Sequence, residues 1–181
     1  DRLAPVEATD GALVPVTAIA SLADRFWLVG REDGALTVRS ADLQKVLDQV
    51  REVGPIWDID VDDATRQVAV ACGLSTAKVY TMDAQTGQLL RPQLFTLPRR
   101  ADLRVPASLH AVRLAAEHGR LIAADDTGRI VGWTLATARP QFILAGYSNS
   151  RSGSGALDKL PPAFRRVVSG VEVLGESEMI V

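Results

Sequence analysis

The chain has 181 residues, of which 47% are hydrophobic and 23% charged, and its formal net charge is −2. This is the composition of an ordinary globular domain with enough apolar material for one core. The small negative net charge argues against a dedicated nucleic-acid binder, which usually has a strong basic excess. No apolar run approaches the ~18 residues of a membrane-spanning helix. We therefore expect neither a nucleic-acid partner nor a membrane segment.

The sequence contains one cysteine, Cys72, and two histidines, His110 and His118. A lone cysteine and no recognisable signal peptide favour a cytoplasmic protein. Cys72 lies in the apolar run VAVACG, so we expect a buried core residue rather than a nucleophile. So few thiols and imidazoles predict no metal site, and we expect no cofactor. The excess of arginine over lysine, 17 to 3, favours a bacterial source.

The chain begins with a lead segment, residues 1–13. Within it, LAPV at 3–6 predicts a short strand at the edge of a sheet, because Pro5 is tolerated only there. We interpret this segment as a strand that could close a ring of sheets.

The first repeat unit starts with two apolar residues three positions apart, Val16 and Ile19, and Leu28 follows nine positions later. The polar break at 23–25 predicts a tight turn, so the unit opens with a β-hairpin. The same spacing recurs in Ile56, Ile59 and Val68, in Leu109, Val112 and Leu121, and in Val168, Val171 and Ile180. Four copies of one spacing predict an architecture of repeated units.

A third strand follows a second turn in three of the units. Gly34 in EDGA and Gly128 in DTGR stand where a short hairpin turn requires positive φ. The middle unit has Ala77 at the position that we align with these glycines, so we expect Gly73 to serve the turn there.

A fourth strand is expected at 45–47, 88–90 and 141–144, and the run 43–53, which could pass for a helix, is interpreted as an outer strand and a crossing. Units of ~40–50 residues with four strands are typical of β-propeller blades. The predicted fold is therefore all-β, a propeller of four-stranded antiparallel blades. The blades are placed at about 14–49, 54–94 and 107–144, with an incomplete fourth at 167–181 and insertions at 95–106 and 145–166.

Two phrases carry a family resemblance. TMDAQTGQLL at 81–90 and GRIVGWTLATAR at 128–139 resemble the signature of WD repeats, and DGALTVRS at 33–40 matches it in part. The resemblance extends from about Val14 to the end of the chain and implies a propeller whose surface loops bind proteins or peptides.

The same phrases depart from the WD-repeat signature. Its Trp-Asp pair becomes Arg39-Ser40, Met82-Asp83 and Trp133-Thr134, and its Gly-His pair is absent. We therefore expect a degenerate propeller in which apolar packing between blades carries more of the stability.

Three blades and a hairpin are fewer than the 4–8 blades of a closed ring. An open arc would expose an apolar blade face and a strand edge. We expect further blades of a longer chain, or a second chain, to complete the ring.

Five residues are candidates for binding. Trp57 and His110 occupy equivalent positions in the first strands of their units, close to the predicted central channel, where a tryptophan can anchor a partner. Arg99, Arg100 and Arg104 form a basic cluster that suits an acidic partner. The alternative for the arginines is a solvated loop, and for Trp57 it is packing between blades; His110 has no acid or nucleophile beside it in the sequence and is not interpreted as catalytic.

Other conspicuous residues have structural interpretations. Trp27 and Trp133 are expected to fill the core between blades. Asp125 and Asp126 precede a turn glycine, so turn chemistry explains them better than a cation or acid–base site.

The predicted function is a non-enzymatic protein-interaction or scaffolding module, the sensor or binding part of a larger protein, with no catalytic residue. The alternative is a propeller enzyme, a hydrolase or lyase with its site over the central channel. The scarcity of histidine and cysteine favours the first prediction, although a fold alone does not determine a function.

Overall fold

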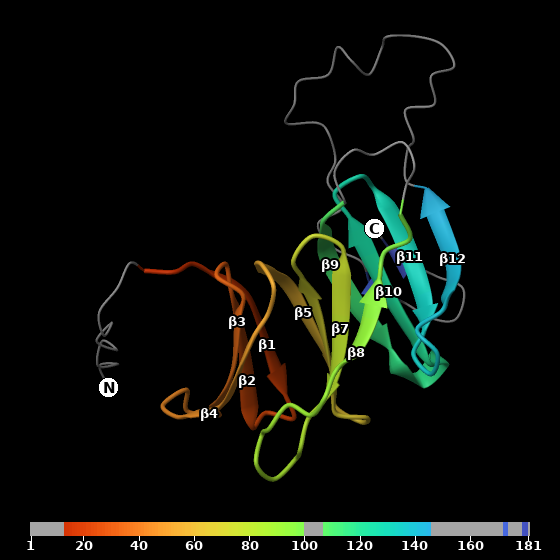
Figure 1. Ribbon diagram of the computed structural model, residues 1–181. Helices are drawn as coiled ribbons and strands as arrows, with labels where there is room; N and C mark the ends of the chain where they lie inside the picture. The colour runs from red at the N-terminus through yellow and green to blue at the C-terminus, as the bar shows by residue number, and fades with distance from the viewer. Residues whose placement is uncertain (1–12, 100–106, 146–171, 174–178, 181) are drawn as a thin grey trace, which may run out of the picture.

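The computed structural model describes residues 13–99, 107–145, 172–173 and 179–180 of the chain. In these ranges the regular structure is β, apart from one short 3-10 turn, Ala116–His118. Three four-stranded antiparallel sheets follow one another along the chain and stand side by side (Figure 1). This confirms the predicted fold class.

Each sheet is a blade whose strands are ordered as they occur in the sequence. Blade 1 contains β1 (Val16–Leu22), β2 (Phe26–Arg31), β3 (Ala35–Ser40) and β4 (Val46–Arg51). Blade 2 contains β5 (Ile56–Asp62), β6 (Gln67–Cys72), β7 (Thr76–Thr81) and β8 (Gln93–Thr96). Blade 3 contains β9 (Leu109–Ala115), β10 (Arg120–Asp125), β11 (Arg129–Thr134) and β12 (Pro140–Ala145). The first strands β1, β5 and β9 neighbour one another, so they are the inner strands of the arc.

The described part of the fourth unit is a two-stranded hairpin. β13 (Glu172–Val173) pairs antiparallel with β14 (Met179–Ile180), and β13 lies near β9 of blade 3. Ile180 therefore falls in a hairpin strand, as its spacing predicts. The first strand predicted at 168–171 and the closing strand predicted at 3–6 lie outside the described residues, as do most of the two predicted insertions.

The run 43–53 forms the outer strand β4, as predicted, but the outer strand of blade 2 was predicted wrongly. It is β8 at Gln93–Thr96 rather than residues 88–90. Residues 88–90 make other contacts. Leu89 forms an isolated β-bridge with Met82, and the N–H of Leu89 donates to Asp48 Oδ2 of blade 1 at 2.7 Å. Residues 88–90 thus connect blades 1 and 2 instead of closing the sheet.

The turn between the second and third strands differs in blade 2. Gly34 and Gly128 adopt φ +83° and +80° near the ends of their turns, as predicted. In blade 2 the positive φ belongs to Gly73, at +64°, which confirms the displaced glycine. The alignment of Ala77 with the turn glycines is wrong, because Ala77 lies inside β7, buried and paired with Ala71.

Apolar side chains fill the two spaces between the blades. The core between blades 1 and 2 includes Leu28, Leu36, Val38, Ile59, Val68, Val70 and Tyr80. The core between blades 2 and 3 includes Ala69, Ala71, Ala77, Phe95, Leu121, Val131 and Trp133. Burial of both faces of blade 2 explains why apolar residues run almost continuously through β6, since each successive side chain meets a neighbouring blade.

The expected core residues are confirmed with one exception. Cys72 is 1% exposed, and Trp133 is fully buried between blades 2 and 3. Trp27 is only half-buried, because it lies on the face of blade 1 that points away from blade 2, with its indole N–H donating to Ala41 O. Among the described residues no helix is long and apolar enough to cross a membrane.

Candidate functional site at the starts of the inner strands

Each inner strand carries a β-bulge at the same place near its start. The register shifts between Val16 and Ala18 in β1, and between Ile56 and Asp58 in β5. In β9 the shift lies opposite Asp125, at His110. The extra residues are Thr17, Trp57 and His110, which confirms that Trp57 and His110 occupy equivalent positions. A bulge re-aims its side chain without disturbing the rest of the ladder.

Two of these three residues contact each other across the blade boundary. The rings of Trp57 and His110 lie 4.9 Å apart between centroids and are tilted by 33°. Both side chains are half-buried, so each keeps part of its surface open. Thr17 instead faces blade 2, where its hydroxyl hydrogen-bonds to the carbonyl of Ile56 and to that of Gly30. The structure therefore brings two of the predicted binding residues together as one aromatic surface.

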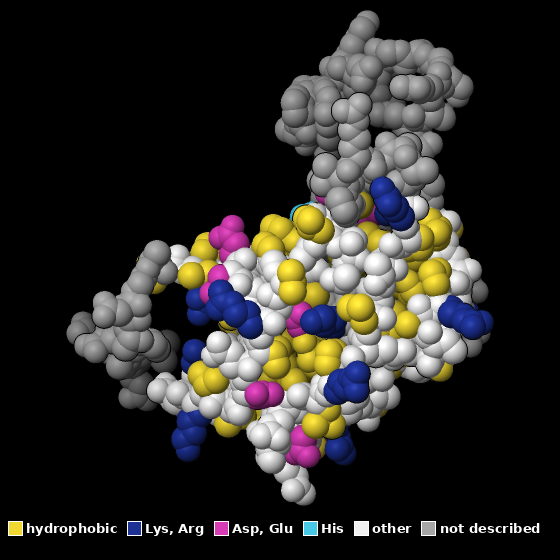
Figure 2. All heavy atoms as spheres, in the orientation of Figure 1, with side chains coloured by type: hydrophobic (Ala, Val, Ile, Leu, Met, Phe, Trp, Pro, Cys, Tyr) yellow, Lys and Arg dark blue, Asp and Glu magenta, His cyan; other side chains and the backbone are white. Residues whose placement is uncertain are grey.

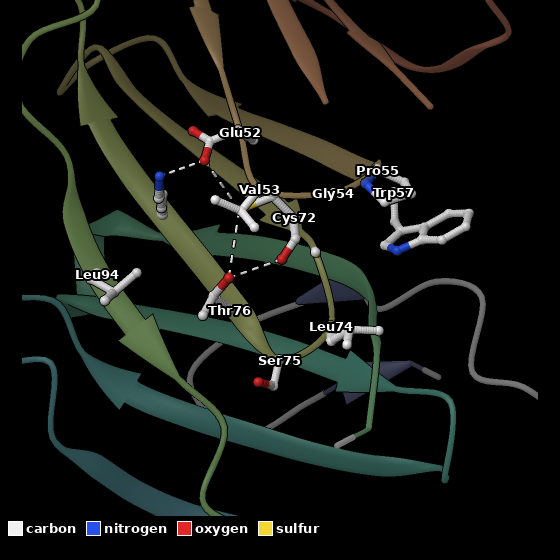
Figure 3. Close-up of a pocket in the computed structure, with 12 residues that line it drawn as sticks. Glu52, Val53, Gly54, Pro55, Trp57, Cys72, Leu74, Ser75, Thr76 and Leu94 are labelled. Atoms are coloured by element: carbon white, nitrogen blue, oxygen red, sulfur yellow. Dashed lines mark hydrogen bonds and ion pairs between the residues drawn. The ribbon is translucent and has the colours of Figure 1, made fainter. Parts of the chain in front are cut away.

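A cavity of about 570 Å³ lies next to this surface, which is within the ~300–1,000 Å³ common for ligand sites. The loop 52–55, which leads from blade 1 into blade 2, and the segment 72–76 line most of it, and Trp57, Lys78 and Leu94 complete the wall (Figure 3). Most of its lining surface is apolar.

One buried carboxylate sits in the wall of the cavity. Glu52 is 5% exposed and accepts hydrogen bonds from the Lys78 ammonium and the Tyr80 hydroxyl, and its Oε2 lies 3.7 Å from Cys72 Sγ. Burial and the neighbouring Glu52 charge raise the pKa of the Cys72 thiol to about 11. Burial and the hydrogen bond to Glu52 also raise the pKa of Tyr80. Cys72 is therefore a protonated, inert thiol at neutral pH.

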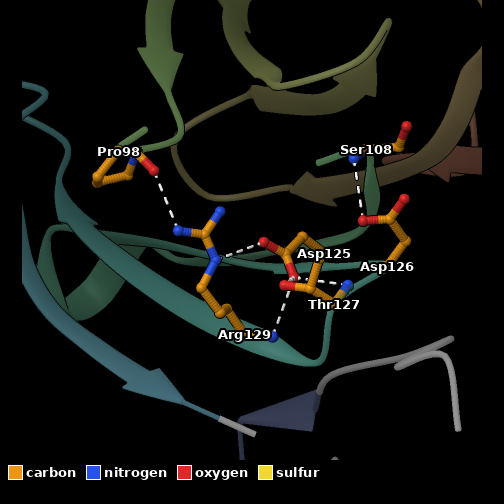
Figure 4. Close-up of polar contacts among 6 residues, drawn as sticks. All are labelled: Pro98, Ser108, Asp125, Asp126, Thr127 and Arg129. Carbon is orange, nitrogen blue, oxygen red and sulfur yellow. Dashed lines mark hydrogen bonds and ion pairs between the residues drawn. The ribbon is translucent and has the colours of Figure 1, made fainter. Parts of the chain in front are cut away.

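A second buried pair ties the loop after blade 2 to blade 3. Asp125 Oδ2 accepts from Arg129 Nε at 2.7 Å, and Arg129 Nη1 donates to the carbonyl of Pro98 at 3.0 Å (Figure 4). Asp125 Oδ1 accepts from the N–H and hydroxyl of Thr127, which closes the turn. Asp126 accepts from the N–H of Ser108 at 3.2 Å. These contacts agree with turn chemistry for both aspartates.

Two carboxylates of β5 bind the free edge of the next inner strand. Asp58 Oδ2 accepts from the N–H of Val112 at 2.9 Å and from Arg113 Nη1 at 2.7 Å. Asp60 Oδ2 accepts from the N–H of Leu114 at 2.6 Å. Burial raises the pKa of Asp60 in spite of this hydrogen bond and the nearby Arg113. These carboxylates satisfy backbone donors that an edge strand otherwise leaves unpaired.

The predicted arginine cluster is only partly within the described residues. Arg99 is exposed at the end of the segment that follows β8, and Arg100 and Arg104 lie outside the described residues. In the described part of the chain, no group of three or more His, Cys, Asp or Glu side chains could hold a metal ion.

The sequence analysis missed Glu52, Lys78 and the loop that forms the cavity. One signal in the sequence could have pointed to this site. The turn of blade 2 has its glycine at Gly73, earlier in the turn than Gly34 and Gly128 in the other two blades, so the repeat is locally broken there. Such departures tend to mark functional or strained positions.

Blades of four antiparallel strands, with inner strands side by side, define a β-propeller arc, and solved structures agree. The chain is similar to the β-propeller domain of Cps50 (Swd1) from Myceliophteria thermophila, with 17% identity and a TM-score of 0.58 over 74% of this chain and 44% of that one. It is similar to the Dos1 propeller, with 15% identity and a TM-score of 0.63 over 74% and 36%. It is also similar to the designed protein Ika4, with 16% identity and a TM-score of 0.61 over 92% and 84%.

This chain therefore spans less than half the length of the Cps50 and Dos1 propellers that it matches. No protein-family model matches the sequence, and no curated protein does so. The likeness to these structures establishes the fold, and the function has to be argued from the site.

Proposed function

We propose that the chain is a non-enzymatic protein-interaction module, a WD-repeat-like propeller segment that binds a protein or peptide partner at the starts of its inner strands. The observation that carries this proposal is the contact between the tilted rings of Trp57 and His110, on two bulged, equivalent positions beside an apolar cavity. Aromatic side chains on a rigid scaffold supply contact area at low entropic cost and are frequent hot spots.

The contacts around this pair support binding over catalysis. Among the described residues, the nearby carboxylates are already engaged: Asp58 holds β9, Asp125 holds Arg129, and Glu52 holds Lys78. The single thiol, Cys72, is buried and protonated. A hydrolase or lyase needs a titratable group free to exchange protons with a substrate, whereas the three carboxylates named here are engaged and the thiol is buried.

The ring around the site is proposed to be completed by further blades or by a second chain. The support is the exposed face of blade 1, where Ile19 is 57% exposed although its counterpart Ile59 in blade 2 is 5% exposed. Covering this face would give blade 1 the same two buried faces that blade 2 has.

The test is an affinity capture from a lysate of the source cells, followed by mass spectrometry. We expect a partner that wild-type protein and the control Leu144→Ser retain, and that the double variant Trp57→Ser/His110→Ala loses by about tenfold or more, equivalent to about 1.4 kcal/mol. Leu144 is a suitable control because it is 47% exposed on the outer strand of blade 3. If every captured protein survives the double variant, the proposed surface is wrong.

The basic cluster is proposed as a secondary contact for an acidic partner. Replacing Arg99, Arg100 and Arg104 together by serine should weaken capture of the same partner and leave the melting temperature nearly unchanged, because surface substitutions usually alter stability by less than about 0.5 kcal/mol. Undiminished recovery of the partner would remove the arginines from the binding surface.

A further inference from the structure

We infer that the cavity between loop 52–55 and segment 72–76 is an anchor pocket for one uncharged aliphatic or aromatic side chain of an extended partner peptide. This inference rests on the proposed function and specifies the chemistry that the partner brings to the site. The occupant is a peptide rather than a small hydrocarbon, because the cavity combines an apolar rim, a wall without surplus charge and unused hydrogen-bond donors.

The rim consists of large apolar side chains that solvent reaches. Val53 is 89% exposed, Leu74 is 56% exposed and Leu94 is 52% exposed. They come from three separate segments and line one cavity. Single exposed apolar residues are common, but several around one hollow mark a place where a partner covers them. In the view of Figure 2, hydrophobic side chains lie across the middle of the described surface, interspersed with Lys, Arg, Asp and Glu.

The charges in the wall cancel each other. The Lys78 ammonium is bound by Glu52, whose side chain is 1% exposed and which also accepts from Tyr80. A charged group that entered the cavity would lose water and find its natural counter-ion already engaged, which is unfavourable. An uncharged side chain has no such cost, so the cavity should bind uncharged side chains in preference to charged ones.

Hydrogen-bond donors beside the cavity lack acceptors among the described residues. The indole Nε1 of Trp57 is buried without a partner. The backbone N–H groups of Leu74 and Ser75 also donate to no described group. A peptide carbonyl is an acceptor for all three donors, and it matters most for the buried indole of Trp57, because an unmade buried hydrogen bond is unfavourable. A peptide supplies those carbonyls on both sides of its anchoring side chain.

The shape of the cavity depends on two glycines that cross at its edge. Gly54 and Gly73 have φ +92° and +64°, and a Cβ built on Gly73 would lie 2.4 Å from Val53 O. The two loops can touch backbone to backbone only because both residues lack a side chain. The pair of glycines is particular to blade 2, because at the equivalent contacts the donor to the carbonyl of Pro15 is the N–H of Glu32 in blade 1, and the donor to the carbonyl of Ser108 is the N–H of Asp126 in blade 3.

The experiment is an NMR titration of ¹⁵N-labelled protein with three capped peptides, acetyl-Gly-Ser-X-Ser-Gly-amide, in which X is leucine, aspartate or lysine. We expect the leucine peptide to shift the Trp57 indole resonance and the Leu74 and Ser75 amides in a saturable way. The aspartate and lysine peptides should bind at least tenfold more weakly. The Trp57 indole is assigned by its loss in Trp57→Phe, because the chain has only three tryptophans.

The matched variants are Leu74→Glu, which places a charge on the rim, and Leu144→Glu, which places one on β12 of blade 3. The first should abolish the shifts and the second should leave them unchanged. The inference fails if the leucine peptide produces no shift at its solubility limit, if the three peptides bind equally, or if Leu74→Glu binds as wild type does.

These outcomes are distinct from a failure of the proposed function. If partner capture depends on Trp57 and His110 but the leucine peptide does not bind, the proposed interaction surface is supported and the anchor pocket is contradicted. If the leucine peptide binds in the cavity but no captured partner depends on Trp57 and His110, the pocket is supported and the proposed function is contradicted.

Discussion

The two spaces between the blades are built on the same register but from different residues. Between blades 1 and 2, both faces contribute branched aliphatic side chains such as Leu36 and Val70. Between blades 2 and 3, the strands of blade 2 contribute alanines, and the volume is filled by Trp133, whose ring meets Phe95 edge-on at 6.2 Å. The repeat therefore sets which positions are buried, and complementary volumes across each space decide which residues occupy them.

The polar parts of the two spaces differ in the same way. Each connecting loop is held by the hydrogen bonds of a buried polar side chain, Glu52 after blade 1 and Arg129 after blade 2. The partners of Glu52 include a phenol and a thiol, whereas Arg129 has only a carboxylate and carbonyl. The two junctions should therefore respond differently to mutation and to pH.

The largest expected effect comes from emptying the space between blades 2 and 3. Trp133→Ala should lower the free energy of unfolding by about 4 kcal/mol, because a fully buried indole is lost and a cavity remains. Urea denaturation followed by circular dichroism measures this. The control Trp27→Ala, on the half-buried face of blade 1, should cost well under half as much, and equal losses would contradict the assignment of Trp133 to the core.

Breaking the buried pair of blade 3 should have the next largest effect. Asp125→Ala leaves the guanidinium of Arg129, which is 6% exposed, without its carboxylate, and should cost about 3 kcal/mol. Cys72 and Thr76 occupy the equivalent positions in blade 2. The double variant Asp125→Cys/Arg129→Thr should therefore recover at least half of the loss in the same urea assay, and a loss as large as that of the single variant would contradict this account.

The junction between blades 1 and 2 should be sensitive to alkali. Cys72 has its pKa raised from 9.0 to about 11, and the pKa of Tyr80 is also raised, so the folded protein keeps protons that the unfolded chain releases. Their contribution to stability is complete below pH 9 and is lost as the pH rises through their folded values. Urea titrations at pH 8 and pH 10 should show the loss.

Glu52→Gln tests the cause of that sensitivity. It removes the negative charge that helps to raise the pKa of both groups, so the decrease in stability between pH 8 and pH 10 should become smaller. At pH 7 the variant should lose about 1–2 kcal/mol, because Lys78 keeps only a neutral acceptor. An unchanged alkaline decrease would show that Glu52 does not control these groups.

The smallest effect is expected at the inner strands. Burial raises the pKa of Asp60, so its contribution is present below its ordinary value of 3.8 and is lost as the pH rises through the folded value. Asp60→Asn keeps an acceptor for the N–H of Leu114 and should stabilise the protein at pH 7 by less than about 1 kcal/mol. The control Asp58→Asn should destabilise it, because Arg113 loses its ion pair; the same sign for both variants would contradict the difference.

The fold could be predicted from the sequence because the spacing of the repeated apolar residues follows the register of the strands. Val16, Ile56 and Leu109 all begin inner strands, and the equivalence of Trp57 and His110 follows from that spacing alone. Strands with weak spacing were less predictable. The outer strand of blade 2 moved to Gln93–Thr96 because the segment around Leu89 is bound to Asp48 of another blade, a long-range contact that no local pattern records.

The site was predictable only in part, for a similar reason. The aromatic pair could be inferred, because both residues lie at one position of the repeat. The cavity could not, because it forms where loop 52–55 meets Gly73, and Glu52 finds Lys78 and Tyr80 more than twenty residues away. Buried ion pairs of this kind depend on distances between segments, whereas composition reports only that the charges exist.

The bulge shared by β1, β5 and β9 has a consequence for how such a surface can change over generations. Thr17, Trp57 and His110 are the extra residues in their ladders, so exchanging one leaves the in–out order of its strand intact. The side chains at this position can thus change one amino acid at a time, while the apolar core between the blades is constrained separately.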